Sequence, residues 1–187
     1  MMKKPLKIPS PQSLANIALH YLGRYAASEA SLRRVLTNRL RRVTMQNSEF
    51  AKDLERQQAL RSVIETIIAT HKRTGVINDA IFAETKVNSL RRQGRSRRAI
   101  QQKLSAKGIA SETITTALSQ NNDGAEPADI ELKAAMALAR KRKLGPFRKT
   151  LADADRSRKD FAALARAGFS SDIARRVLKT EAPDEWE

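Results

Sequence analysis

Residues 78–118 read NDAIFAETKVNSLRRQGRSRRAIQQKLSAKGIASETITTAL, and this stretch decides the fold because it carries the signals of three short helices. The second predicted helix is the clearest of them. Ser96 can cap its N-terminus, and Gly108 ends it. Between these residues, Ile100 and Leu104 lie four positions apart, which places both on one helix face. The pattern therefore predicts a helix with a defined inner side.

The helices on either side follow the same rules. Asn78 can cap the first helix, which Gly94 ends, and Ser111 can cap the third. A unit of this size has too little apolar surface to stand alone, so we expect it to stack on similar units. The apolar residues at helical spacing are Ile81, Phe82 and Val87 in the first helix and Ile114 and Leu118 in the third.

The rest of the chain is predicted to be helical as well. No proline occurs between Pro11 and Pro127, and proline in a helix interior costs about 3 kcal/mol. Alternating apolar and polar runs with tight-turn dipeptides, which mark strands, are almost absent. Residues 1–12 read as a flexible arm and residues 181–187 as a tail. Three further helices are expected before the central stretch: one over 13–26, one that begins at Ser28 or Ser31, and one over 50–72. Three more are expected after it: over 130–144, over 157–167, and from Ser170 or Ser171. Tyr25 and Leu54 are expected among the inward side chains.

Two pairs of segments repeat. Leu104–Leu118 matches Leu164–Leu178 at leucine, glycine, serine and acidic positions, and Ser28–Leu36 is a weaker match to Ser96–Leu104. We therefore predict one all-α domain over residues 13–180, built as an elongated, curved array of three tandem three-helix repeats. The predicted units span about 13–75, 76–120 and 128–180. In the second and third, Gly108 and Gly168 should adopt a left-handed backbone at a helix end.

Composition bounds the function more than the fold. The 187 residues carry 36 Lys and Arg against 20 Asp and Glu, a formal net charge of +16. A charge of this size favours an anionic partner such as nucleic acid or an acidic protein surface. The chain has no cysteine, its first residues do not have the pattern of a signal peptide, and no window of the sequence approaches the roughly 18 continuous apolar residues of a membrane span. These features lead us to expect a cytoplasmic protein without a membrane partner.

Catalysis is not predicted. His20 and His71 are the only histidines and lie in different predicted units, without the spacing of a zinc site. The seven glycines are scattered singly, so no phosphate-cradling loop is present. The carboxylates Asp153 and Asp155 fall among basic residues, as solvated helix-face charges do. We expect no enzyme activity, no cofactor and no metal.

The basic residues are the informative feature. Where they mix with acids, as around Arg56 and Glu65, solvation of an outer helix face accounts for them. No acid lies between Glu84 and Glu112, however, and like charges at helical spacing repel, so an external anion is the better explanation there. The candidate anion-binding residues are Arg91, Arg92, Arg95, Arg97, Arg98, Lys103, Lys107, Arg140, Lys141, Arg142 and Lys143.

The nature of the anion stays open between phosphate and acidic protein. Aromatic residues make up 4% of the chain and fall mostly at core-facing positions, which argues against a base-stacking platform for single strands. Two hypotheses remain. One is a regulator that contacts a protein–DNA assembly, and the other is a general helical DNA-binding protein that acts through phosphate contacts alone.

The central stretch resembles the RecX family of recombinase regulators. The patterns IND-x-IFA, R-x-x-GRSRR-x-I and L-x-x-KGI-x-x-x-x-I-x-x-x-L occur in the family's order over Ile77–Leu118, and RAGFSSDIARRVL looks like its last helix pair. The resemblance covers about Leu14–Leu178. The chain departs at Asn78-Asp79, where the family often has two acids, and over about 43–59, which is longer than usual.

The resemblance implies a partner and an activity that composition does not. Such proteins bind in the groove of a RecA–DNA filament and restrain its recombinase, ATPase and coprotease activities. This chain is accordingly expected to be a monomeric regulator of a RecA-like filament that contacts the recombinase and the DNA within it.

Overall fold

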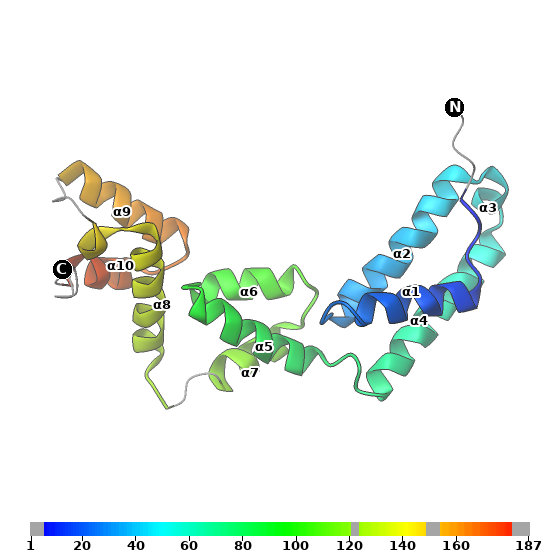
Figure 1. Ribbon diagram of the computed structural model, residues 1–187, viewed down its shortest axis with the longest axis horizontal. Helices are drawn as coiled ribbons and strands as arrows, with labels where there is room; N and C mark the ends of the chain where they lie inside the picture. The colour runs from blue at the N-terminus through cyan, green and yellow to red at the C-terminus, as the bar shows by residue number, and fades with distance from the viewer. Residues whose placement is uncertain (1–5, 121–123, 149–153, 181–187) are drawn as a thin grey trace. The chain divides into compact units, whose positions relative to one another are not determined.

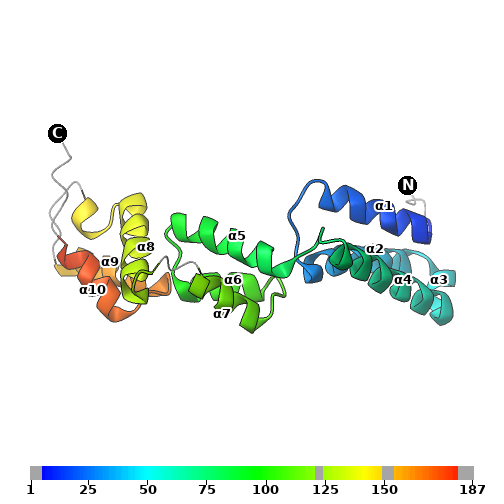
Figure 2. The same cartoon turned by 90° about the horizontal axis from the view of Figure 1, so that it is seen from below.

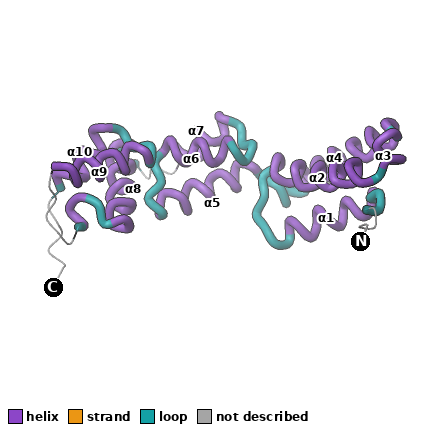
Figure 3. The backbone as a smooth tube through the Cα atoms, turned by 90° about the horizontal axis from the view of Figure 1, so that it is seen from above, coloured by secondary structure: helices purple, strands orange, loops and turns teal. Residues whose placement is uncertain are grey.

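The computed structural model describes residues 6–120, 124–148 and 154–180 (Figure 1). All regular secondary structure within these ranges is helical, as Figure 3 shows, so the predicted all-α class is confirmed. The elements are α1 (Pro11–Leu22), α2 (Glu29–Gln46), α3 (Ser48–Lys52), α4 (Leu54–Arg73), α5 (Asp79–Arg92), α6 (Arg97–Ser105), α7 (Ser111–Gln120), α8 (Pro127–Arg142), the 3-10 turn η1 (Gly145–Phe147), α9 (Ala154–Arg166) and α10 (Ser171–Lys179).

The chain forms two compact units. The N-terminal unit comprises residues 1–82 and 107–109, and the C-terminal unit comprises residues 83–106 and 110–187. In the N-terminal unit α1, α2 and α4 pack around one apolar core (Figures 1 and 2). The largest fully buried side chains of this core are Leu14, Leu32, Leu36, Phe50, Ile64, Ile68 and Val43.

The start of the chain differs from the sequence prediction. α1 begins at Pro11, inside the segment expected to be a flexible arm, because Ser10 caps it and proline fits the first helical turn. Leu6 and Ile8 pack against the core, so the described part of this segment is not free in solvent. α1 ends at Leu22, which leaves Tyr25 beyond the helix and exposed rather than inward.

The single helix predicted over residues 50–72 is also wrong, because the chain breaks at Asp53. The Asp53 carboxylate accepts a hydrogen bond from the Arg56 N–H at 2.9 Å and so caps α4. Phe50 in the short helix α3 is buried, and its carbonyl accepts from the Gln57 side chain at 2.8 Å. Leu54 starts α4 with 72% of its surface exposed, contrary to the expected inward position.

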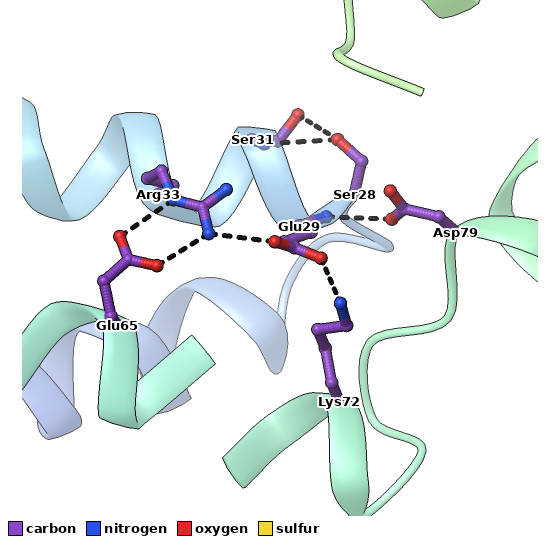
Figure 4. A network of polar contacts seen from close by, with 7 residues as sticks. All are labelled: Ser28, Glu29, Ser31, Arg33, Glu65, Lys72 and Asp79. Carbon is purple, nitrogen blue, oxygen red and sulfur yellow. Dashed lines mark hydrogen bonds and ion pairs between the residues drawn. The ribbon is translucent and has the colours of Figure 1, made fainter. Parts of the chain in front are cut away.

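The N-terminus of α2 is held by residues that are distant in sequence. Ser28 caps the helix, and its hydroxyl donates to the Lys107 carbonyl at 2.7 Å. The Glu29 N–H donates to Asp79 Oδ1 at 2.9 Å (Figure 4). The backbone at Gly108 has a φ of +77°, and a Cβ there would lie 2.2 Å from Ala30 Cβ. We call this arrangement the α2 junction, formed by Ser28, Glu29, Ala30, Asp79, Lys107 and Gly108.

An ion-pair network lies beside the α2 junction. Arg33 binds both carboxylate oxygens of Glu65, at 2.9 and 2.7 Å, and also reaches Glu29 at 2.8 Å (Figure 4). Lys72 pairs with the other oxygen of Glu29 at 2.6 Å. Hydrogen bonds from Lys72 and then Arg33 lower the pKa of Glu29, and Arg33 lowers the pKa of Glu65. The charged side chains of this network, Arg33, Glu65, Glu29 and Lys72, therefore neutralise one another within the protein.

In the C-terminal unit, α8, η1, α9 and α10 enclose a second apolar core that includes Leu164 and Phe169. α8 begins at Pro127, three residues before the predicted start, since proline again occupies the first turn. α9 begins at Ala154, where 157 was expected. No helix in the described ranges is long and apolar enough to cross a membrane.

Candidate anion-binding surface

α6 carries three of the predicted basic residues, Arg97, Arg98 and Lys103, and its N-terminus is built as the sequence predicted. Ser96 caps the helix by accepting from the Ala99 N–H at 3.2 Å. Ile100 and Leu104 are buried, at 0% and 1% exposure, which turns Arg98 and Lys103 to solvent. Asn78 likewise caps α5 as expected, by accepting from the Ile81 N–H at 3.1 Å, although the Ile81 side chain is exposed.

A second junction fixes this N-terminus. The Ser96 hydroxyl donates to the Ala167 carbonyl at 2.7 Å, and the Arg97 N–H donates to Glu131 Oε1 at 2.8 Å. Gly168 has a φ of +90°, and a Cβ there would lie 2.6 Å from Ser96 Oγ. The left-handed backbone predicted at Gly108 and Gly168 is thus confirmed. We call this arrangement the α6 junction, formed by Ser96, Arg97, Glu131, Ala167 and Gly168, together with Arg91, which pairs with Glu131.

Arg91 does not fit the role predicted for it. Its guanidinium forms an ion pair with Glu131, and the two side chains are only 11% and 18% exposed. Arg91 therefore compensates a buried internal carboxylate, and its charge is not offered to an outside anion. Arg97 is half-buried, and its backbone N–H serves the same carboxylate. Sequence reasoning missed Glu131, because no local pattern shows that α8 returns to α6.

The turn between α5 and α6 lies directly against α8. Gly94 has a φ of +73°, and a Cβ there would lie 2.7 Å from Leu138 N and 2.9 Å from the Ala134 carbonyl oxygen. Only a glycine permits this approach of two backbones. Lys141 and Arg142 follow Leu138 by three and four residues, which is about 5–6 Å along the helix axis. The turn between Arg92 and Arg95 therefore lies against α8 about one helical turn before Lys141 and Arg142.

Eight of the predicted cations are exposed. Within the described ranges, no ion pair joins any of them to a carboxylate. Arg140 lies over the Phe147 ring at 5.3 Å from its centroid, and Lys143 ends α8 in a left-handed conformation with a φ of 54°. We call this set the α6–α8 cation surface: Arg92, Arg95, Arg98, Lys103, Arg140, Lys141, Arg142 and Lys143.

Two further basic residues make contacts within the protein. Lys107 belongs to the N-terminal unit, where its carbonyl serves the α2 junction. Arg148, which has no acidic neighbour in sequence, pairs with the buried Asp160. Burial of Asp160 opposes its ionisation, but hydrogen bonds from Arg148 and the Gly145 N–H outweigh this and lower its pKa. Within the described part of the chain, no group of three or more possible metal ligands comes together.

The basic segment coincides with a known family pattern. The model of the family domain described as "RecX, second three-helix domain" matches residues 78–118. The regulatory protein RecX of Myxococcus xanthus is 42% identical over 177 residues, which cover 94% of this chain and 89% of that protein. The chain belongs to the RecX family of regulatory proteins. Membership in this family agrees with the expectation that the chain is a regulator and not an enzyme.

Other RecX proteins extend this result. The regulatory protein RecX of Agrobacterium fabrum is 43% identical over 102 residues, which cover 54% of this chain and 51% of that protein. The crystal structure of RecX from Lactobacillus salivarius aligns with a TM-score of 0.63 and 20% sequence identity, covering 90% of this chain and 94% of that one. The RecX fold is thus shared although most side chains differ.

Proposed function

We propose that this RecX-family chain binds a RecA-like recombinase filament on DNA and inhibits its recombinase, ATPase and coprotease activities. The single observation that carries the proposal is the α6–α8 cation surface. Eight exposed basic side chains lie at the end of α5, on the turn before α6, on α6 and at the C-terminal end of α8, and none pairs with a carboxylate in the described ranges. Such an excess of one charge favours an anionic partner.

The mechanism divides the basic residues into two groups. Arg91 and the Arg97 N–H hold Glu131 and so fix α6 on α8. Arg92, Arg95 and Arg98 then point their charge outward from a fixed backbone, so little ordering is needed on binding. Cations gain nothing from the macrodipole at a helix N-terminus, which is the position of Arg98. The arrangement therefore suits binding better than stability.

Recombinase ATPase activity on single-stranded DNA tests the proposal. The triple variant Arg92→Gln, Arg95→Gln, Arg98→Gln should retain its melting temperature but lose at least about tenfold in inhibitory potency. If DNA phosphates are the targets, the salt dependence of filament binding should also flatten by about 2–3 units of log–log slope.

The matched control removes the same charge elsewhere on the C-terminal unit. Arg158, Arg166 and Lys179 are exposed, and their replacement by Gln should leave inhibition within about threefold of the unchanged chain. If both triple variants lost inhibitory potency equally, the effect would depend on net charge alone, and the α6–α8 cation surface would have no specific role in the mechanism. Binding to recombinase in the absence of DNA distinguishes a filament regulator from a protein that contacts DNA alone.

The larger organisation belongs to the same proposal. We propose three tandem repeats over about 13–75, 76–120 and 128–180 in an elongated monomer that acts in the bacterial cytoplasm. A compact chain of 187 residues would have a radius of gyration of about 16 Å. Solution scattering should instead give more than about 20 Å at a monomeric mass.

A further inference from the structure

α2 presents a second, separate basic face in the N-terminal unit. Leu32, Leu36, Leu40 and Val43 are buried and define its inner side. Arg34 and Arg41 lie on the opposite side, two helical turns and about 10 Å apart along the axis. Both are exposed. The outward face of α2, as we name it, comprises Arg34, Thr37, Asn38, Arg41, Arg42 and Met45, all exposed.

This face carries no negative charge. The only acid in α2 is Glu29, which lies at the N-terminus of the helix and is bound by Arg33 and Lys72. Arg33 sits on the flank that faces α4, where Glu65 neutralises it. Within the described residues, no ion pair reaches Arg34, Arg41 or Arg42. Of the five arginines of α2, the protein therefore neutralises Arg33, keeps Arg39 half-buried and leaves three on the outward face.

The neighbouring helix α4 has the mixed surface charge of an ordinary solvated helix face. The exposed side of α4 also carries arginines, but Glu55 and Glu65 lie among them. Mixed charge of this kind serves solubility without long-range repulsion. The three arginines on the outward face of α2 have no acid among them and instead repel one another unless an anion is present. The contrast within a single compact unit singles out α2.

The chemistry of the face favours a phosphate backbone over a protein partner. Protein interfaces depend on a central cluster of buried aromatic or aliphatic anchors, and this face offers only Met45. Thr37 and Asn38 sit between the arginines, and arginine, threonine and asparagine are the side chains that contact DNA phosphates. The face has no aromatic side chain on which a base could stack.

We propose that the outward face of α2 is a nucleic-acid phosphate-binding surface, distinct from the α6–α8 cation surface and independent of any recombinase. It contacts the sugar–phosphate backbone of duplex DNA without reading sequence. Arg34, Arg41 and Arg42 supply the charge, and Asn38 supplies a neutral donor between them.

The test measures binding of the full chain to a fluorescently labelled 20-base-pair duplex, over a range of salt concentrations and without recombinase. The triple variant Arg34→Gln, Arg41→Gln, Arg42→Gln should bind at least about tenfold more weakly and flatten the log–log salt slope by about 3 units. The matched control replaces Arg56, Arg61 and Arg73 of α4 by Gln, an equal charge change in the same unit, and should change affinity by less than about threefold.

Melting temperatures of both triple variants establish that each is folded. Equal weakening in both variants, or unchanged duplex binding in the α2 variant, would overturn the proposal. So would an α2 variant that keeps duplex binding but loses affinity for recombinase alone, since the occupant would then be an acidic protein surface. Because the duplex assay contains no recombinase, its failure leaves the ATPase inhibition assigned to the α6–α8 cation surface unaffected, and the reverse also holds.

Discussion

The α2 and α6 junctions are built on the same backbone plan with opposite side-chain charge. In each, a capping serine donates to the carbonyl of the residue that precedes a left-handed glycine, Gly108 or Gly168. In each, the first N–H of the helix donates to a carboxylate from a distant helix, at 2.9 Å from Glu29 and 2.8 Å from Arg97. The recurrence shows that the two helix N-termini are held by equivalent contacts.

The difference lies in the charge of the first helical residue and in the ion pairs around it. In the α2 junction the first helical residue is Glu29, and Arg33 and Lys72 neutralise it. In the α6 junction the first residue is Arg97, and Glu131 is matched by Arg91. Additional arginines at 92, 95 and 98 are then left over. At the α2 junction, Arg33 and Lys72 neutralise the first helical residue. At the α6 junction, positive charge remains available to a partner.

The largest expected effect comes from filling the space at the two glycines. Gly108→Ala forces a Cβ onto that of Ala30 and should lower the free energy of unfolding by about 3 kcal/mol, from backbone strain plus overpacking. Gly168→Ala should also cost about 3 kcal/mol, because displacing Ser96 Oγ adds the loss of its cap and of its hydrogen bond to the Ala167 carbonyl to the backbone strain. Urea denaturation followed by circular dichroism measures both.

Gly75→Ala is the control for these substitutions. Gly75 has a φ of +74°, but a Cβ there would meet no atom within 4 Å, so this variant reports backbone strain alone, about 1–2 kcal/mol. If Gly108→Ala cost no more than Gly75→Ala, the close approach to Ala30 would be wrong.

The next effect separates the two carboxylates. Glu131→Gln should cost about 2 kcal/mol, because it leaves the Arg91 guanidinium, only 11% exposed, without a counter-charge. Asp79→Asn should cost about 1 kcal/mol, since only the hydrogen bond from the Glu29 N–H weakens. Adding Arg91→Met to Glu131→Gln should recover part of the loss in a double-mutant cycle. Additive costs would mean that Arg91 and Glu131 do not interact.

The serine caps should behave alike in the two junctions. Ser28→Ala and Ser96→Ala each remove a cap and a hydrogen bond to a distant carbonyl, and each should cost about 1.5–2 kcal/mol. Ser10 caps α1 through the Ser13 N–H, so Ser10→Ala should cost only about 1 kcal/mol. Thermal melts of the three variants rank them, and a Ser10 variant as unstable as the others would contradict the shared plan.

The smallest effect is the acid sensitivity of the network beside the α2 junction. The pKa values of Glu29 and Glu65 lie below the ordinary value of 4.5, so their contribution is present above pH 4.5 and is lost as the pH falls through the lowered values. Arg33 and Glu65 are 38% and 56% exposed, which limits the contribution to about 0.5 kcal/mol. Arg33→Gln should remove this part of the change in urea midpoint between pH 6 and pH 3.5. If the change in urea midpoint were as large in this variant as in the unchanged chain, the acid sensitivity would come from other carboxylates.

The repeated sequence segments acquire a physical meaning in these junctions. Ser28–Leu36 and Ser96–Leu104 each begin at a capping serine, and Leu104–Leu118 and Leu164–Leu178 each contain a left-handed glycine. Sequence comparison therefore found both halves of the junction without showing that they meet. The pairing was invisible because each hydrogen bond joins residues far apart in the chain, as with Ser28 and Lys107.

Local chemistry in the sequence was enough to specify most of the helices, the caps at Asn78, Ser96 and Ser28, the left-handed glycines at 108 and 168 and the excess of positive charge. These depend on neighbours within about four residues, which is the range of a helical turn. Which charges remain available depended on the packing of distant helices. Glu131 pairs with Arg91 and so removes it from the predicted binding set. Asp160 pairs with Arg148, which was not in that set, and Gly94 brings the turn before α6 against α8. A carboxylate neutralises whichever cation lies beside it in space, and that neighbour is set by the fold.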